Sequence, residues 1–320
     1  MVTFSDIESA YKTLKPVIHT TPLLSSRTFN DAIGNDVWFK AENFQRIWAF
    51  KFRGAYNKIS SLTPEESKRG IIAHSSGNHA QGVALASKLL GLRATIVMPH
   101  NSVKSKVNAT RSYGADIVFC EDSTDDRERV CHDLIAKHGF TLIHPYNDPV
   151  LIAGQGTVGL EIFQDIKELD YLFAPIGGGG LISGCSVAVK HLCPSARVIG
   201  VETEGANDAW QSFNQKKLVK LAKVNTIADG MRTLSIGTNN FDIIMNYVDD
   251  IITIPDSDIF PMMRFFYERM KIVVEPTGAV APAAVMKNIL HLKGKKICAI
   301  ISGGNVDAEV FRQMLGCVSP

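Results

Sequence analysis

The chain has 320 residues, of which 45% are hydrophobic and 21% charged, so it can bury a substantial core as one large domain or two moderate ones. Its 34 basic and 32 acidic side chains leave a formal charge of +2, so neither nucleic acid nor an anionic membrane is an expected partner. No apolar run is long enough to span a bilayer, and the N-terminal sequence MVTFSDIESAYKTLK lacks the pattern of a signal peptide.

The six cysteines are spread along the chain without a C-x-x-C pair. The missing pair argues against a zinc site, and scattered cysteines in a chain of this size are typical of buried, reduced thiols. We therefore expect a soluble protein of the cytoplasm. The cysteines are Cys120, Cys131, Cys185, Cys193, Cys298 and Cys317.

The first half of the chain alternates short apolar runs with helical patterns. Short runs that are nearly all apolar predict buried strands, whereas apolar residues at helical spacing predict helices. Strands are expected at 37–43, 70–76, 94–99, 115–120 and 141–146, and helices at 76–91, 103–114 and 125–139.

The second half continues this alternation around a more polar stretch at about 206–250. Because the strands are apolar throughout and alternate with helices, we predict an α/β protein with parallel sheets covered on both faces. Strands are expected at 171–176, 197–203, 250–255 and 295–302, and helices at 181–193, 257–271 and 277–290.

Three of the predicted strands end in polar turns that contain glycine. Ligands of open α/β sheets bind beyond the carboxyl ends of the strands, so these turns are candidates for a binding site. They are SSGNH at 75–79, GGGG at 177–180 and SGGN at 302–305.

The GGGG run predicts a phosphate-binding loop. Successive glycines expose backbone N–H groups at the start of a helix, whose dipole also favours an anion. The alternative is a tight turn with positive φ angles, but four glycines exceed what a turn requires. The run is not a Walker loop, because G-K-[ST] is missing, and its spacing differs from the dinucleotide fingerprint.

Lys51 lies between Phe50 and Phe52, with Trp48 just upstream. Such a lysine is usually a surface residue whose charge extends past buried neighbours. The alternative is a partly desolvated amine that can be neutral and nucleophilic. The phosphate loop favours the second interpretation, because pyridoxal 5′-phosphate needs both an anion site and a lysine for a Schiff base.

With these features the chain resembles the serine racemase and serine/threonine dehydratase family of fold-type II pyridoxal-phosphate enzymes, and its racemase branch in particular. The matching motifs occur in order across nearly the whole chain. They are FKFRGA at 50–55, SSGNHAQ at 75–81, AGQGT at 153–157, GGGGL at 177–181, IADG at 227–230, ERMKIVVEPTGA at 268–279 and SGGNVD at 302–307.

The resemblance implies a tryptophan synthase β-like architecture of two domains, with parallel twisted sheets covered by helices and the cofactor between them. The large cofactor-binding domain would comprise 1–69 and 149–320, and a small mobile domain would comprise 70–148. A domain inserted in this way suits closure over a substrate. The resemblance also implies a homodimer.

The resemblance assigns cofactor contacts to matching residues. Lys51 would form the Schiff base and then act as an acid/base at the substrate Cα. Asn78 would bind the ring hydroxyl, and Ser302 would face the ring nitrogen. A hydroxyl partner leaves that nitrogen largely unprotonated, which fits β-elimination and proton exchange. The phosphate would be held by Gly177, Gly178, Gly179 and Gly180.

Ser76 is the expected second acid/base, because in serine racemases the serine at this place lies across the cofactor from the lysine. Racemisation needs one group on each face of Cα. The alternative is that Ser76 caps the following helix or contacts the substrate carboxylate. Dehydratases share this serine, so it does not decide between the two activities.

Other substrate contacts are expected at the start of the same helix. Ser75, Asn78 and His79 would bind the substrate carboxylate, although His79 could equally be a packed polar residue. Arg127 reads from its neighbours as one charge on a solvated helix face. The resemblance adds a substrate role, because serine racemases and 3-hydroxyaspartate-cleaving relatives carry an arginine here.

A divalent ion is expected at Glu202, Ala206 and Asp208, where the racemase branch holds one. Two carboxylates and a carbonyl oxygen suit Mg²⁺, or alternatively Ca²⁺ or Mn²⁺. Without the resemblance, the stretch is an acidic loop at a strand end. Allosteric control, if present, would act through this metal, through ATP at a subunit interface, or through oligomerisation.

The predicted activity is interconversion of L- and D-serine with concurrent elimination of serine to pyruvate and ammonia. The alternatives are a catabolic L-threonine/L-serine dehydratase, a 3-hydroxyaspartate ammonia-lyase, and a non-catalytic amino-acid-binding homologue. Two departures bear on substrate preference: the family usually has glycine where Trp48 stands, and Tyr146 occupies a variable position near the cofactor ring.

Overall fold

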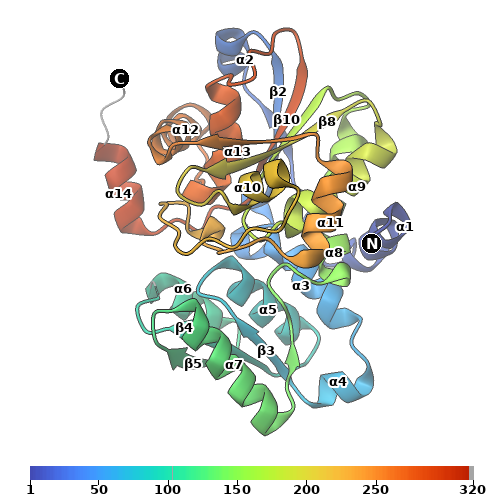
Figure 1. Ribbon diagram of the computed structural model, residues 1–320, viewed down its shortest axis with the longest axis vertical. Helices are drawn as coiled ribbons and strands as arrows, with labels where there is room; N and C mark the ends of the chain where they lie inside the picture. The colour runs from blue at the N-terminus through green and yellow to red at the C-terminus, as the bar shows by residue number, and fades with distance from the viewer. Residues whose placement is uncertain (103, 317–320) are drawn as a thin grey trace.

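The computed structural model describes residues 1–102 and 104–316. Val103, with which one predicted helix begins, and Cys317 lie outside the described residues. The chain forms two lobes that lie one above the other along the long axis of the molecule, and each lobe is built on its own sheet (Figure 1). This arrangement confirms the α/β prediction, while the predicted domain limits stay a prediction.

The larger sheet has six strands in the order β1-β2-β10-β7-β8-β9. All neighbours pair in parallel except β1, which is antiparallel to β2. The strands are β1 Leu23–Ser25, β2 Asp36–Ala41, β7 Tyr171–Pro175, β8 Arg197–Thr203, β9 Asp250–Ile254 and β10 Lys296–Ile301.

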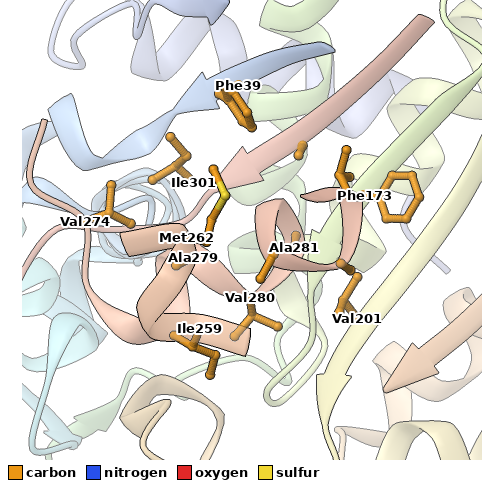
Figure 2. Close-up of a cluster of buried hydrophobic side chains, with 14 of the residues drawn as sticks. Phe39, Phe173, Val201, Ile259, Met262, Val274, Ala279, Val280, Ala281 and Ile301 are labelled. Carbon is orange, nitrogen blue, oxygen red and sulfur yellow. The ribbon is translucent and has the colours of Figure 1, made fainter. Parts of the chain in front are cut away.

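Helices cover both faces of this sheet. Successive strand residues point to opposite sides, and because both sets are apolar, each face needs a covering layer. Phe173 and Ile301 pack with α12 and α13 in one core, whereas Leu172 and Ile300 pack with α8 and α9 in another. Figure 2 shows the first core, where Met262 and Ala281 meet the strands. The helices of this six-stranded lobe include α8 Pro149–Asp165, α9 Gly180–Leu192, α10 Asp208–Gln215, α11 Thr238–Tyr247, α12 Ile259–Phe265 and α13 Pro276–Met286.

The smaller sheet has four parallel strands in the order β5-β4-β3-β6. Ile71 and Ile96 pack on the side of α5 and of α3 (Lys51–Ser60), and Ile72 and Val97 pack on the side of α7. The strands are β3 Ile71–His74, β4 Ala94–Pro99, β5 Asp116–Cys120 and β6 Thr141–Leu142. With α5 Asn78–Leu89, α6 Lys104–Ser112 and α7 Thr124–His138 they form the four-stranded lobe.

The remaining helices lie in the N-terminal part of the chain and at the C-terminal end of the described residues. The chain enters through α1 Phe4–Leu14, whose N-terminus is closed by a capping box of Thr3 and Asp6. The others are α2 Arg27–Ile33, α3 Lys51–Ser60, α4 Pro64–Lys68 and α14 Ala308–Gly316.

Predicted and observed limits differ at several elements, and two of the differences have a clear physical description. The strand expected at 141–146 ends at Leu142, because the His144 imidazole accepts the Tyr146 and Asn147 N–H groups and the chain turns there. The helix expected at 257–271 is divided, since α12 passes at Phe266 into a short π-helical turn that ends at Met270. A π-helical turn often marks a functional position.

In the part of the chain described, five cysteines are free thiols; four of them are buried, as predicted, whereas Cys193 is half-buried. Within residues 1–102 and 104–316, no helix is both long enough and apolar enough to cross a membrane.

Candidate active site

Lys51 opens α3 beside the turn that follows β10. The Phe50 N–H donates to the Ser302 carbonyl oxygen over 3.1 Å, and Ala49 pairs with Gly303 in an isolated bridge. These backbone contacts fix the start of α3 to the carboxyl end of the central strand. Two of the predicted motifs, FKFRGA and SGGN, therefore lie side by side.

The amine of Lys51 lies in a desolvated place. Its Nζ donates to the Pro145 carbonyl oxygen over 2.7 Å and lies 5.3 Å from the centre of the Phe50 ring. Burial lowers the pKa of Lys51 to about 8. A lysine with such a pKa is partly neutral near pH 7, which a nucleophile or general base requires.

The SSGNH turn joins β3 to α5 and faces the same region. The second turn of α5 packs on α3 so closely that a Cβ at Gly82 would lie 3.3 Å from the Lys51 carbonyl. Ser75 Oγ accepts the Gly77 N–H over 3.2 Å, and Ser76 is half-buried in the turn. The turn thus approaches Lys51 from the four-stranded lobe.

Asn78 connects this turn to the six-stranded lobe. Its Nδ2 donates to Glu275 Oε1 over 2.7 Å, and its Oδ1 accepts from Asn305 Nδ2 over 2.8 Å. The second N–H of the amide has capacity for one more acceptor. The predicted contact with the cofactor hydroxyl therefore stays compatible with the structure.

The GGGG run turns sharply between β7 and α9. Gly179 has φ 93°, which favours glycine, and a Cβ at Gly178 would overlap the ring of Tyr146. Asn240 Nδ2 donates to the carbonyl oxygens of Gly178 and Tyr146 over 2.8 and 3.0 Å and so holds the loop. Helix α9 begins at Gly180 without a side-chain cap, so its first N–H groups have no partner within the helix and suit a phosphate.

Ser302 supplies an unusual feature in this region. Its side chain is buried, yet its Oγ has no hydrogen-bond partner among the described residues. Buried hydroxyl groups are normally paired, so an isolated one indicates a place for a ligand. A ring nitrogen at this position would satisfy it.

His79 and Arg127 lie at the edge of the four-stranded lobe. His79 is buried with its Nε2 2.9 Å from the Ile143 carbonyl oxygen, and burial followed by the charge of Lys51 holds its pKa well below the usual value. Burial and then the charge of Arg127 lower the pKa of His74 to about 4, so Arg127 lies near the end of β3. Their predicted substrate contacts stay predictions.

Glu202, at the end of β8, and Asp208 form an acidic site separate from the candidate cofactor site. Both side chains are buried, and burial raises their pKa values, that of Asp208 to about 7. Glu202 accepts the N–H groups of Ala209 and Trp210, while Asp208 Oδ2 has no hydrogen-bond partner among the described residues. Two buried carboxylates, one of which has an unpaired oxygen, fit a divalent cation, while the third predicted ligand, the Ala206 carbonyl, stays a prediction.

A comparison with protein families decides the class of protein. The model of a family described as pyridoxal-phosphate dependent enzyme matches residues 14–303. The chain belongs to this family. Its fold is fold-type II, and the enzyme class predicted from the motifs is confirmed.

Curated relatives of this enzyme carry several activities. An L-threo-3-hydroxyaspartate ammonia-lyase of Saccharomyces cerevisiae is 46% identical, with 98% of this chain and 96% of the relative covered. A serine racemase of Schizosaccharomyces pombe is 44% identical, with 98% and 97% covered. Among solved structures, maize serine racemase has a TM-score of 0.94 and 40% identity, with 98% of this chain and 97% of that chain covered.

The residues fit the family's cofactor. A desolvated lysine, a glycine loop at a helix N-terminus and a buried unpaired hydroxyl are the three groups that the cofactor requires. Glu275 and Asp229 lie within two of the family motifs, but no role for them was predicted from the sequence. A buried acidic residue within an apolar run, as in VVEPTGA, was the available signal for Glu275.

Proposed function

We propose that this enzyme interconverts L- and D-serine and also eliminates water from serine to yield pyruvate and ammonia. The observation that carries the proposal is the amine of Lys51: burial lowers its pKa to about 8, and the start of its helix contacts both the turn that holds Ser302 and the helix that follows the SSGNH turn. Full-length similarity to serine racemases supports it.

Different residues of the protein would bind the cofactor and transfer the proton at the substrate Cα. When bound, pyridoxal phosphate withdraws electron density from the substrate Cα. Gly177 to Gly180 hold its phosphate, and Lys51 and Ser76 exchange a proton with Cα from opposite faces. Reprotonation from the face opposite to that of removal inverts the configuration. Loss of the β-hydroxyl with a proton instead leads to pyruvate and ammonia.

A second candidate function is an ammonia-lyase acting on threonine or 3-hydroxyaspartate. Relatives named for these substrates are 42% to 46% identical to this enzyme. The side chain of Arg127 favours a substrate with a second carboxylate, since a guanidinium pairs with such a group. The elimination uses the same Cα proton, so Lys51 serves both reactions.

Further proposals concern ions, nucleotides and assembly. Glu202, the Ala206 carbonyl and Asp208 would bind Mg²⁺ and stabilise the loop after β8. ATP is proposed as an effector at a pocket of about 570 Å³, where Arg269 could meet a phosphate and apolar side chains could meet the base; its lining is Pro22, Leu24, Ser25, Ser26, Phe44, Arg269, Met270 and Ile272. The exposed apolar side chains of Trp48, Tyr267 and Val273 support a homodimer. Free thiols support a cytoplasmic location.

The test follows both products in one reaction. Cofactor-loaded enzyme is incubated with L-serine and Mg²⁺, D-serine is measured by chiral chromatography and pyruvate is measured in parallel. We expect both products from the native enzyme, and loss of D-serine from Ser76→Ala. Pyruvate without D-serine would overturn the racemase proposal and favour the ammonia-lyase, with L-threonine and L-threo-3-hydroxyaspartate as the next substrates. Cofactor absorbance that L-serine perturbs without any product would indicate a binding protein.

A further inference from the structure

Two side chains of the four-stranded lobe reach acidic residues of the six-stranded lobe. Lys106, on α6, forms an ion pair with Asp229 in the short 3-10 turn Asp229–Met231. Asn78, at the start of α5, donates to Glu275 Oε1 over 2.7 Å. Since α5 and α6 pack against each other, two neighbouring helices of one lobe make both contacts.

Lys106 pairs with Asp229 and acts on Glu275 through its charge. It is 7% exposed, and Glu275 is 2% exposed. Burial alone would lower the pKa of Lys106, but the carboxylates of Asp229 and Glu275 outweigh it and raise that pKa. Without Lys106, its positive charge would no longer offset the repulsion between Asp229 and Glu275. Loss of Lys106 therefore weakens the contact between the lobes in two ways. It removes the attraction between Lys106 and Asp229, and it leaves the repulsion between Asp229 and Glu275 uncompensated.

The contact lies next to the glycine loop. Gly230 follows Asp229, and a Cβ at Gly177 would lie 2.6 Å from the Gly230 carbonyl oxygen. The Gly230 N–H donates to Thr277 Oγ1 over 2.9 Å, which fixes the turn to α13. The acidic partner of Lys106 is thus held rigidly at the rim of the candidate active site, whereas Lys106 belongs to the other lobe.

We propose that Lys106 is a positioning residue whose ion pair with Asp229 holds the four-stranded lobe closed against the glycine loop. Lys106 itself needs no contact with substrate or cofactor. It sets the fraction of molecules in which the SSGNH turn meets Lys51, and that fraction scales the apparent affinity for substrate. Only this kinetic consequence rests on the proposed function.

The first test measures closure without turnover. Hydrogen exchange is recorded on cofactor-loaded enzyme with no substrate, comparing native protein with Lys106→Met. We expect amides of α6 and of residues 229–231 to exchange at least about fivefold faster in the variant, since their protection follows the closed fraction. Asp229→Asn should produce a smaller increase, because it removes the ion pair without exposing the repulsion, and the double variant should exchange no faster than Lys106→Met, because both changes remove one interaction.

The second test is kinetic and uses matched variants. Lys106→Met should raise KM for L-serine about tenfold with a smaller change in kcat, as expected when the competent fraction falls. Lys106→Arg keeps the charge and should restore most of the affinity. Lys104→Met, on the exposed first turn of the same helix, should behave as native.

Separate outcomes overturn the two proposals. Unchanged exchange in Lys106→Met, or additive effects of Lys106→Met and Asp229→Asn, would overturn the positioning role. Faster exchange in an enzyme that does not convert serine would leave the positioning role supported and the proposed function refuted. A Lys106→Met protein that loses kcat while KM stays native would also count against the role.

Discussion

Arg53 and Glu161 form an ion pair with no access to solvent, in which the guanidinium donates to both carboxylate oxygens over 2.8 Å. Arg53 also donates to both oxygens of Glu42, and Lys40 donates to Glu161. The network joins β2, α3 and α8. Since Arg53 lies two residues after Lys51, it anchors the helix that carries the candidate catalytic amine.

Arg53→Met should destabilise the enzyme by about 3–5 kcal/mol, because it leaves two buried acidic residues with Lys40 as the remaining cation. Chemical denaturation of the cofactor-loaded protein measures the effect. Arg129→Met, which removes two ion pairs at the surface of α7, is the matched control and should leave the transition unchanged. Equal effects of the two substitutions would show that the buried network does not anchor α3.

Trp48→Gly should raise thermal stability. Trp48 has φ 58°, a conformation that costs a residue with a side chain about 1–3 kcal/mol, and its side chain is 57% exposed. Glycine relieves the strain at an entropic cost of about 0.5–1 kcal/mol, so a rise of about 2 °C in the melting temperature is expected.

The neighbouring residue provides the control for Trp48. Ile47 also has a positive φ, of 55°, but its side chain is only 3% exposed. Ile47→Gly should therefore lower the melting temperature, since the lost burial exceeds the relieved strain. A fall with both substitutions would mean that the Trp48 side chain makes stabilising contacts that its exposure does not reveal.

The regular strands could be predicted because their sequences are apolar throughout and sharply bounded. The runs at 94–99 and 197–203 coincide with β4 and β8. Helix α8 was missed, because its glycines lower helix propensity and its faces are buried on all sides. The structure shows why they are needed: a Cβ at Gly154 would lie 2.8 Å from Gly54 Cα, and one at Gly156 would lie 2.8 Å from the Gly184 carbonyl oxygen.

Residues of the candidate site could be predicted only where they belong to a recognisable local motif. Lys51, the SSGNH turn and the GGGG run each stand out locally, and their roles came from resemblance. The acidic cluster of Asp229 and Glu275, with Lys106 between them, joins three distant segments. No local sequence pattern indicates such a cluster, because its residues come together only in the tertiary structure. The same holds for Arg53, whose partners Glu42 and Glu161 are brought together by folding.

Lys51 gives a pH prediction for cofactor attachment. Only the neutral amine reacts with an aldehyde, and a pKa lowered to about 8 means that the neutral form grows as pH rises through that value. Attachment to cofactor-free protein should thus accelerate up to about pH 8 and level off above pH 9, whereas an ordinary lysine would accelerate beyond pH 10. Borohydride trapping followed by mass spectrometry measures the rate, with Lys51→Ala as the blank. Acceleration that continues past pH 10 would contradict the desolvated amine.

Magnesium should stabilise the enzyme through Asp208. Burial and the neighbouring Asp208 raise the pKa of Glu202, so two acidic groups share one place without a counter-charge among the described side chains. A bound cation would remove that cost, and Mg²⁺ should raise the melting temperature in a concentration-dependent way. Asp208→Asn should abolish the rise while leaving the metal-free protein at least as stable as native, because it removes one of the two facing charges. Glu204→Gln, on the exposed side of the same loop, should respond to Mg²⁺ as native does. If Asp208→Asn responded equally well, the cation would have to bind elsewhere.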